Sequence, residues 1–314
     1  MHLALFCGIN YKKVPSFPVG YTDSIKLYSL DFEEFLWANG MSEEAICFLK
    51  EYFDKKEPIP YSIHEKMMQL FKEYIVVGGM PRVVSEFTNT HNFGEVLRIQ
   101  KEIINDYLDD IAKYAGGNEK AKARACFLSI PKQLAKVNKK FQYSVVKSGG
   151  TSKKYEGSLM WLFDAGIINF CHNLSKPELP LEGYSIEDQF KVYMNDTGLL
   201  ISMLEEGSGK DIIDGNLGIY KGAIYENIIA ETFTKLEKKL YYFQFKDKIE
   251  IDFFIKKNNL ATAIEVKSAD NTKSKSLNSM INNRNVQYGI KLSSKNIVGK
   301  EKIDSIPLYM AMFL

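Results

Sequence analysis

The sequence predicts a multi-domain protein in which an α-helical first part precedes an α/β part with a mixed sheet flanked by helices. Three observations support this prediction. A chain of 314 residues is longer than a domain with one ordinary hydrophobic core, so several small domains are expected. Most segments between residues 42 and 166 carry apolar side chains at helical spacing. Residues 223–292, in contrast, change repeatedly between helical and strand-like patterns.

The composition is that of a soluble globular protein. No apolar run is long enough to cross a bilayer, and residues 1–7 lack the basic start and cleavage site of a secretory signal. A cytoplasmic protein without membrane contact is therefore expected. The net charge of +2 neither demands nor excludes nucleic acid, so such a partner would have to contact a local patch.

The cysteines are too far apart to form a zinc ribbon or a CxxC redox motif. We expect them to be free, buried thiols. The four positions are Cys7, Cys47, Cys126 and Cys171.

Residues 1–40 are predicted to be the tail of an incomplete domain. Apolar and polar residues alternate over 24–30, which predicts a strand. An acidic start at Asp31 then opens a helix with apolar residues three and four apart. One strand and one helix alone cannot bury their apolar side chains, so the beginning of this domain is expected to be absent.

Residues 41–95 are predicted to be helical. Ser62 and Glu65 have the spacing of a capping box ahead of an apolar stripe. The run Gly78-Gly79-Met80-Pro81 should end that helix, with Pro81 starting the next one. Spacing alone favours a simple helix-helix turn here.

Residues 96–205 are predicted to hold a helical and winged-helix region. Residues 92–125 show one long amphipathic pattern, and a short helix begins at 130. A second short helix over 155–166 should stop at Gly166 and lead into a strand at 167–170. Two short helices and a β-wing are typical of a winged helix.

Three lysines are the candidate nucleic-acid contacts of this region: Lys147, Lys153 and Lys154. They could bind phosphates, or belong to a solvated surface of a module that contacts protein. The second interpretation is favoured, because no arginine cluster or base-reading polar group lies on the second helix.

The tripeptide Asp196-Thr197-Gly198 invites comparison with an aspartic protease. It has no second copy, however, and a helix-like run follows it. A helix N-cap at Asn195 or Asp196 is the more economical interpretation.

The last predicted unit, residues 206–314, has the order expected for a small mixed sheet with helices on both faces. Asn258-Asn259 should form a hairpin turn between its second and third strands. The predicted elements are a helix over 223–237, strands over 239–245, 249–255 and 261–267, a helix over 274–281, and a strand over 287–292.

Within this unit the sequence predicts a metal site. Strand alternation puts Glu265 and Lys267 on one face, and hairpin pairing brings Asp252 close to both. Two carboxylates are suitable ligands for Mg²⁺ or Mn²⁺, and a lysine can orient a nucleophile or stabilise charge on a phosphate. Glu226 on the preceding helix could add a further carboxylate. This arrangement is typical of metal-dependent phosphodiesterases.

A simpler interpretation is that Glu265 and Lys267 form an ordinary charge pair in a strand. The Glu-x-Lys pattern alone is weak. Its combination with Asp252 upstream, Glu226 on a preceding helix and an apolar strand favours the metal site.

An ordered series of motifs makes the chain similar to the C-terminal part of bacterial and archaeal AAA-superfamily ATPases that end in a restriction-endonuclease-like (PD-(D/E)xK-type) domain of unknown function. The series covers nearly the whole chain, and as a set it is far more specific than any one motif. It comprises Phe17-Pro18-Val19-Gly20, Leu27-Tyr28-Ser29-Leu30-Asp31-Phe32-Glu33-Glu34-Phe35-Leu36, Gly78-Gly79-Met80-Pro81, Lys154-Tyr155-Glu156, Trp161-Leu162-Phe163-Asp164-Ala165-Gly166-Ile167, Tyr193-Met194-Asn195-Asp196-Thr197-Gly198-Leu199, Gly222-Ala223-Ile224-Tyr225-Glu226-Asn227, Ile251-Asp252-Phe253, Glu265-Val266-Lys267 and Ser274-Lys275-Ser276-Leu277.

The resemblance implies a helical lid over 41–95 and assigns Glu226, Asp252, Glu265 and Lys267 to the nuclease-like positions. Members of this fold include inactive binding versions. The ATPases also carry a phosphate loop, and this chain has no GxxxxGK[ST]. ATP hydrolysis by this polypeptide alone is therefore not expected. A truncated gene product, or a member that has lost its motor, would explain the difference.

These observations lead to a DNA-associated protein with a Mg²⁺-dependent endonuclease-like domain. The alternative is a non-enzymatic interaction or regulatory module that keeps an inactive nuclease fold. A protein partner or a homo-oligomer would fit either function. A third possibility is an ATPase that works only with a partner chain.

Overall fold

A computed structural model describes residues 25–114, 119–136, 139–215, 220–245, 249–267, 274–283, 286–299 and 302–314. The chain is a mixed α/β protein, with a run of helices followed by a seven-stranded sheet. The elements are α1 Phe32–Ala38, α2 Glu43–Lys55, α3 Tyr61–Val77, α4 Pro81–Thr90, α5 Phe93–Tyr114, α6 Glu119–Leu134, α7 Tyr143–Val146, α8 Ser152–Asp164, β1 Ile168–Leu174, η1 Leu181–Tyr184, β2 Ser185–Met194, α9 Thr197–Ser202, α10 Ser208–Ile213, α11 Lys221–Lys235, β3 Leu240–Phe245, β4 Ile249–Lys257, β5 Leu260–Val266, α12 Lys275–Asn283, β6 Tyr288–Ser293, β7 Ile303–Pro307 and η3 Leu308–Phe313.

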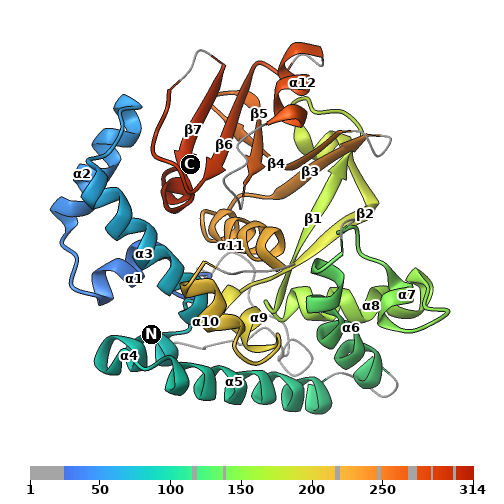
Figure 1. Ribbon diagram of the computed structural model, residues 1–314. Coiled ribbons are helices and arrows are strands. Elements are labelled where there is room, and N and C mark those ends of the chain that lie inside the picture. Colours follow the sequence, from blue (N-terminus) through green and yellow to red (C-terminus); the bar gives the residue numbers. More distant parts are fainter. Residues whose placement is uncertain are drawn as a thin grey trace.

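The strands form one sheet in the order β2-β1-β3-β4-β5-β6-β7 (Figure 1). Strands β1–β2, β3–β4 and β4–β5 pair antiparallel, whereas β1–β3, β5–β6 and β6–β7 pair parallel. The predicted turn joins β4 and β5, and both Asn258 and Asn259 have positive φ, as a two-residue hairpin loop requires. The sheet is mixed, as the sequence predicted.

Helix α11 packs on one face of this sheet and α12 on the other (Figure 1). Phe233 of α11 meets Phe253 of β4 edge to face, with ring centroids 5.7 Å apart. On the opposite face, Leu277 and Met280 of α12 join a separate apolar cluster with Phe254. The sheet is thus buried from both sides, which explains its apolar strands.

The predicted helix after Asp31 is confirmed as α1. The Glu34 amide donates to Asp31 Oδ1, and the Asp31 amide donates to Glu34 Oε2, both at 2.8 Å. This reciprocal capping box fixes the start of the helix.

Two other predictions near the N-terminus are wrong. Residues 25–30 form no strand, because apolar alternation makes a strand only where a neighbouring strand supplies hydrogen bonds; Ser24 lies outside the described residues. The Leu30 amide donates instead to Gly79 O at 2.7 Å. Ser62 caps nothing, since α3 begins one residue earlier, after Pro60.

The helix predicted over 92–125 is two helices in the structure. Helix α5 ends at Tyr114 and α6 begins at Glu119. The intervening sequence contains Gly116 and Gly117, and consecutive glycines disfavour a continuous helix. The C-capping glycine is confirmed: Gly166, with φ +71°, follows α8 and precedes β1.

The hairpin expected to be the wing of a winged helix belongs to the large sheet. Strand β1 pairs with β2 on one side and, through residues Cys171 to Asn173, with β3 on the other. The sheet therefore runs across the predicted boundary between 96–205 and 206–314. Strand β7 and helix η3 were not predicted, and they complete the far end of the sheet.

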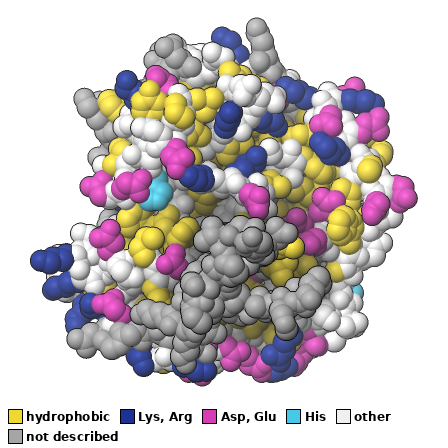
Figure 2. Space-filling view, turned by 180° about the vertical axis from the view of Figure 1, so that it is seen from behind, with side chains coloured by type: hydrophobic (Ala, Val, Ile, Leu, Met, Phe, Trp, Pro, Cys, Tyr) yellow, Lys and Arg dark blue, Asp and Glu magenta, His cyan; other side chains and the backbone are white. Residues whose placement is uncertain are grey.

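Of the cysteines, Cys126 and Cys171 are buried and free as expected, whereas Cys47 is free but exposed; Cys7 lies outside the described residues. None of the described helices is long and apolar enough to cross a membrane. On the face seen in Figure 2, the described basic and acidic side chains are interspersed. This distribution agrees with the nearly balanced net charge.

Candidate active site

A β-bulge in β4 positions Asp252. The pairing of β3 with β4 shifts register here, so that one extra residue lies between Ile251 and Phe254. Ile251 and Phe254 consequently share the face of α12, although they are three residues apart. The two residues between them, Asp252 and Phe253, turn toward α11. Simple alternation does not predict this bulge.

The carboxylate of Asp252 lies at the end of the β4–β5 ladder. Its Oδ2 atom accepts the backbone N–H of Val266 at 2.8 Å. Burial, and next the negative charge of Glu226, raise the pKa of Asp252 to about 7, although the ammonium group of Lys191 acts in the opposite direction. The uptake of positive charge at this position is therefore favourable.

Glu265 and Lys267 form a pair at the end of β5. Glu265 is 4% exposed, and its Oε1 atom lies 2.7 Å from Lys267 Nζ. The other oxygen, Oε2, is buried without a hydrogen-bond partner among the described residues. The Lys267 amide donates to Leu292 O at 2.8 Å, which holds this end of β5 against β6. An unpartnered buried carboxylate oxygen calls for a cation or a water molecule.

Glu226 enters the site from α11 and is already engaged. Lys139 donates to its Oε1 atom, and Tyr193 donates to Oε2 at 3.1 Å. Lys191 Nζ lies 3.6 Å from Oε2. Burial alone would raise the pKa of Glu226, but the ammonium groups of Lys191 and Lys139 outweigh it and hold the pKa below its ordinary value.

The sequence interpretation missed Lys191, which is the most buried charge of the site. Its side chain, 1% exposed, comes from β2 and places Nζ 2.6 Å from Glu250 Oε1. Nζ also lies 4.8 Å from the ring centre of Tyr242. A lysine within the apolar strand Phe190-Lys191-Val192-Tyr193-Met194 was the available signal, because a strand buried on both faces holds such a charge only with partners.

The structure thus brings the predicted residues together as two pairs. Glu226 and Asp252 share the electrostatic influence of Lys191 and Lys139. Glu265 and Lys267 contact each other, and the Val266 amide connects this pair to Asp252. Among the described residues, no three His, Cys, Asp or Glu side chains form a group that could hold a metal ion.

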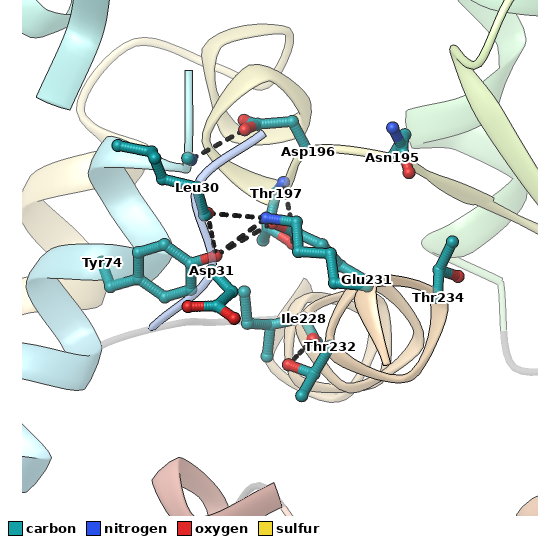
Figure 3. Close-up of polar contacts among 12 residues, drawn as sticks. Leu30, Asp31, Tyr74, Asn195, Asp196, Thr197, Ile228, Glu231, Thr232 and Thr234 are labelled. Carbon is teal, nitrogen blue, oxygen red and sulfur yellow. Dashed lines mark hydrogen bonds and ion pairs between the residues drawn. The ribbon is translucent and has the colours of Figure 1, made fainter. Parts of the chain in front are cut away.

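A second polar cluster joins two other motifs of the sequence, the Gly-Gly-Met-Pro turn and the Asp-Thr-Gly tripeptide. Asp196 lies beside Thr197 and Leu30 (Figure 3). The Gly79 amide donates to Asp196 Oδ2 at 2.8 Å, and the Leu199 amide donates to Asp196 Oδ1 at 2.9 Å. Asp196 therefore caps α9, as predicted, and also holds the turn after α3. Burial, and next the charge of Glu231, raise the pKa of Asp196 to about 6.

Helix α11 extends this cluster. Glu231 Oε2 accepts the amide and the hydroxyl of Thr197 at 2.7 and 2.6 Å (Figure 3). Its Oε1 atom lies 2.6 Å from Lys235 Nζ, which also donates to Leu30 O at 2.8 Å. Tyr74 completes the cluster by donating to the same Leu30 carbonyl. Because every one of these groups has a protein partner, the cluster acts as a structural joint.

Two stretches of the chain match known domain families. Residues 68–210 match a domain of unknown function, DUF8612, and residues 221–310 match another, DUF4143. The second is commonly found in the C-terminal region of AAA-ATPase-associated proteins, in loose agreement with the resemblance noted in the sequence. No curated protein and no solved structure matches the chain.

The two matches divide the candidate site. All four predicted residues, Glu226, Asp252, Glu265 and Lys267, fall within 221–310. The lysines that neutralise Glu226 fall within 68–210. The site is consequently assembled from both stretches.

Proposed function

We propose that this protein is a nucleic-acid-associated phosphodiesterase whose C-terminal sheet acts as a restriction-endonuclease-like domain with Mg²⁺ or Mn²⁺. One observation carries the proposal, the arrangement of carboxylates where the β4–β5 ladder ends. Asp252 accepts the Val266 amide there, next to Glu265, whose Oε2 atom is buried without a partner among the described residues. Lys267 lies at the same end of β5.

Two properties of these residues suit a divalent cation. The buried Glu265 oxygen requires a partner, and the pKa of Asp252 is raised by burial and by the charge of Glu226, both of which a bound cation would offset. Asp252 and Glu265 would therefore hold the ion with oxygen ligands of the type that Mg²⁺ prefers. In this proposal Glu226 is not itself a metal ligand, because both of its oxygens already bind other groups.

When bound, the ion would lower the pKa of a bound water and neutralise charge on the phosphate. The side chains and backbone of the site orient the metal ligands and the attacking water, and they supply positive charge. The Val266 amide fixes one Asp252 oxygen, and Lys267 would orient the attacking water or stabilise charge developing on the phosphate. The ion pair between Lys267 and Glu265 keeps this ammonium group beside the carboxylates.

Nucleic acid would be bound locally. Lys147, Lys153 and Lys154 are exposed around the start of α8, so they are available to phosphates. The interspersed charges of Figure 2 support a local contact rather than a broad basic surface.

The test is cleavage of single- and double-stranded DNA and RNA by the purified chain with Mg²⁺, Mn²⁺ or EDTA. Asp252→Ala and Lys267→Ala should each lower the nicking rate by about 10²-fold or more, because each removes a group that acts at the transition state. Asp188→Ala and Lys256→Ala are matched controls at exposed strand positions and should cleave like wild type. Cleavage that survives both site substitutions would reject the assigned roles.

The rival proposal is a non-enzymatic interaction or regulatory module with an inactive nuclease fold. Two observations favour it. The described residues contain no group of three possible metal ligands, and other side chains already bind both oxygens of Glu226. Calorimetric titration with Mn²⁺ near neutral pH separates the two functions. A flat titration would support the rival.

ATP hydrolysis is not part of the proposed function of this chain alone. The sequence contains no GxxxxGK[ST], and so it lacks the lysine and backbone donors that bind the phosphates. An ATPase that works with a partner chain would require nucleotide binding to appear when that partner is added.

A further inference from the structure

A surface cavity of about 470 Å³ opens where α5, α6 and the end of α9 meet. These three helices lie together in the lower part of Figure 1. None of the described residues that line the cavity belongs to the candidate active site. Its volume is in the range of cavities that bind small organic molecules. The cavity is therefore a candidate for a second, separate binding site.

The walls of the cavity come from residues at helical spacing. Lys101 and Ile104 lie three positions apart on α5, and Leu128, Pro131 and Lys132 lie three and four positions apart on α6. Each of these helices thus turns one stripe of side chains toward the cavity. The two stripes have the same composition, since each combines apolar side chains with one lysine. Leu128 keeps 46% of its surface exposed, so the apolar wall is open to a ligand.

The charged side chains that line the cavity, among the described residues, are two exposed lysines, Lys101 and Lys132. Neither lysine has an acidic residue three or four positions away on its own helix. Glu102, the acid next to Lys101 in sequence, pairs instead with Arg82 and Arg98. Both ammonium groups are consequently left to interact with an anion from outside the chain.

We propose that this cavity binds a small organic anion with an apolar body, whose charge is a carboxylate, phosphate or sulfonate group. The anionic group would lie between Lys101 and Lys132, because ammonium groups form strong hydrogen bonds with such oxygens. The apolar body would cover Ile104, Leu128 and Pro131 and remove them from water. This inference is independent of the phosphodiesterase function, since it uses no residue of that site.

The experiment titrates the full-length chain with anilinonaphthalene sulfonate, an aromatic anion whose fluorescence rises in apolar surroundings. Lys101→Met/Lys132→Met should weaken binding by about tenfold or more, because both charged partners of the sulfonate are lost. Lys66→Met/Lys120→Met is the matched control, at exposed lysines outside the cavity, and should bind like wild type. Unchanged affinity in the first variant, or an equal loss in the control, overturns the proposal.

Leu128→Glu and Leu128→Gln test the apolar wall. Leu128 is exposed on α6 and glutamate and glutamine are good helix formers, so both variants should melt close to wild type by circular dichroism. Both should bind the probe more weakly than wild type, and Leu128→Glu more weakly than Leu128→Gln, because its carboxylate repels the sulfonate. Affinity equal to that of wild type in both variants would overturn the position of the apolar body. Equal affinity of the two variants would overturn the place of the anionic group.

Competition identifies the part of the ligand that is recognised. Naphthalene sulfonate should displace the probe from wild type, whereas inorganic sulfate and the neutral naphthalenemethanol should each be weaker competitors by about tenfold or more, because each lacks one half of the ligand. Equal displacement by the neutral compound would overturn the role of the lysines.

A membrane surface is the other source of such anions. Wild type should stay in solution when vesicles of phosphatidylglycerol are sedimented. If wild type sediments with the vesicles and Lys101→Met/Lys132→Met does not, the two lysines bind a lipid surface and the small-molecule proposal is overturned.

Discussion

At the residue scale, the site is governed by the balance between buried acids and buried ammonium groups. Glu226 is held ionised by Lys191 and Lys139, whereas the pKa of Asp252 is raised to about 7. The net pKa shifts of the two carboxylates therefore have opposite signs, although Lys191 and Lys139 lower the pKa of both. Asp252 is the group whose protonation changes near neutral pH.

Asp252→Asn should flatten the dependence of stability on pH in EDTA. The pKa of Asp252 is raised from 3.8 to about 7 on folding, so its contribution to stability is present below its ordinary pKa and is lost as pH rises through 7. Relative to the variant, wild type should lose on the order of a few kcal/mol between pH 4 and 8. Urea unfolding of both proteins across this range measures the difference. Parallel curves would contradict the prediction.

Gly198→Ala should destabilise the joint between α3 and α9. A Cβ atom at Gly198 would lie 2.5 Å from Val77 O and 2.6 Å from Gly78 N, which are backbone atoms that cannot rotate away. We expect a cost of about 1–3 kcal/mol or more, measured by thermal unfolding.

Gly157→Ala is the matched control for this substitution. Gly157 lies within α8, and the nearest atom to its added Cβ is Glu119 Oε2 at 4.0 Å. The added methyl group should raise the melting temperature, because alanine favours a helix over glycine by up to about 1 kcal/mol. Similar losses at both positions would argue against a steric cause.

At the element scale, α11 connects the two polar clusters. Its first turns carry Glu226 into the candidate site, and its last turn carries Glu231 and Lys235 into the joint with α9 and Leu30. Between them, Asn227 is fully buried and bonds both backbone groups of Met194 on β2.

Asn227→Ala should therefore weaken the attachment of α11 to β2. It leaves the Met194 amide without its partner at 2.8 Å, and each buried unsatisfied group costs about 1–3 kcal/mol. Asn89→Ala is the control, since Asn89 is exposed, and it should change stability by about 0.5 kcal/mol or less. Chemical denaturation of both variants measures the effect, and equal stability would count against the connecting role of Asn227.

The elements of the C-terminal part were predictable because each carries a local pattern. The helices and strands from 223 to 292, the Asn258-Asn259 turn and the Asp196 cap all follow from period, turn chemistry and capping. The bulge at Asp252 was not predictable, since it depends on the register between β3 and β4.

The same limit applies to the site. Glu265 and Lys267 are near neighbours in sequence, and their contact follows from strand alternation. Lys139 and Lys191 reach Glu226 from 87 and 35 positions away, so only the fold brings them there. Strand β7 escaped prediction because residues 303–307 are too short a segment to show a period.

At the scale of the whole molecule, one sheet unites the segments that the sequence divides. Strand β3 pairs with β1 on one side and with β4 on the other. Removal of the β1–β2 hairpin would therefore leave β3 as an unpaired edge strand. It also removes Lys191, one of the two lysines that partner Glu226.

The fragment 206–314 should consequently fail to fold cooperatively, because it buries Glu226 without a cation and leaves β3 uncovered. The fragment 139–314 restores β1, β2 and both lysines and should show the sharper thermal transition. Circular dichroism melting and amide-proton dispersion compare the two. A cooperative transition in 206–314 alone would show that the C-terminal unit is independent of the hairpin.

The continuity of this sheet also limits how such chains can recombine. Exchange of residues 221–310 for the equivalent stretch of another protein would import carboxylates without the ammonium groups that match them. In such a hybrid the buried charges of the site stay balanced only if β1, β2 and Lys139 are exchanged together with residues 221–310. The stretch that carries both the buried acids and their ammonium partners is therefore larger than residues 221–310 and includes Lys139 and Lys191.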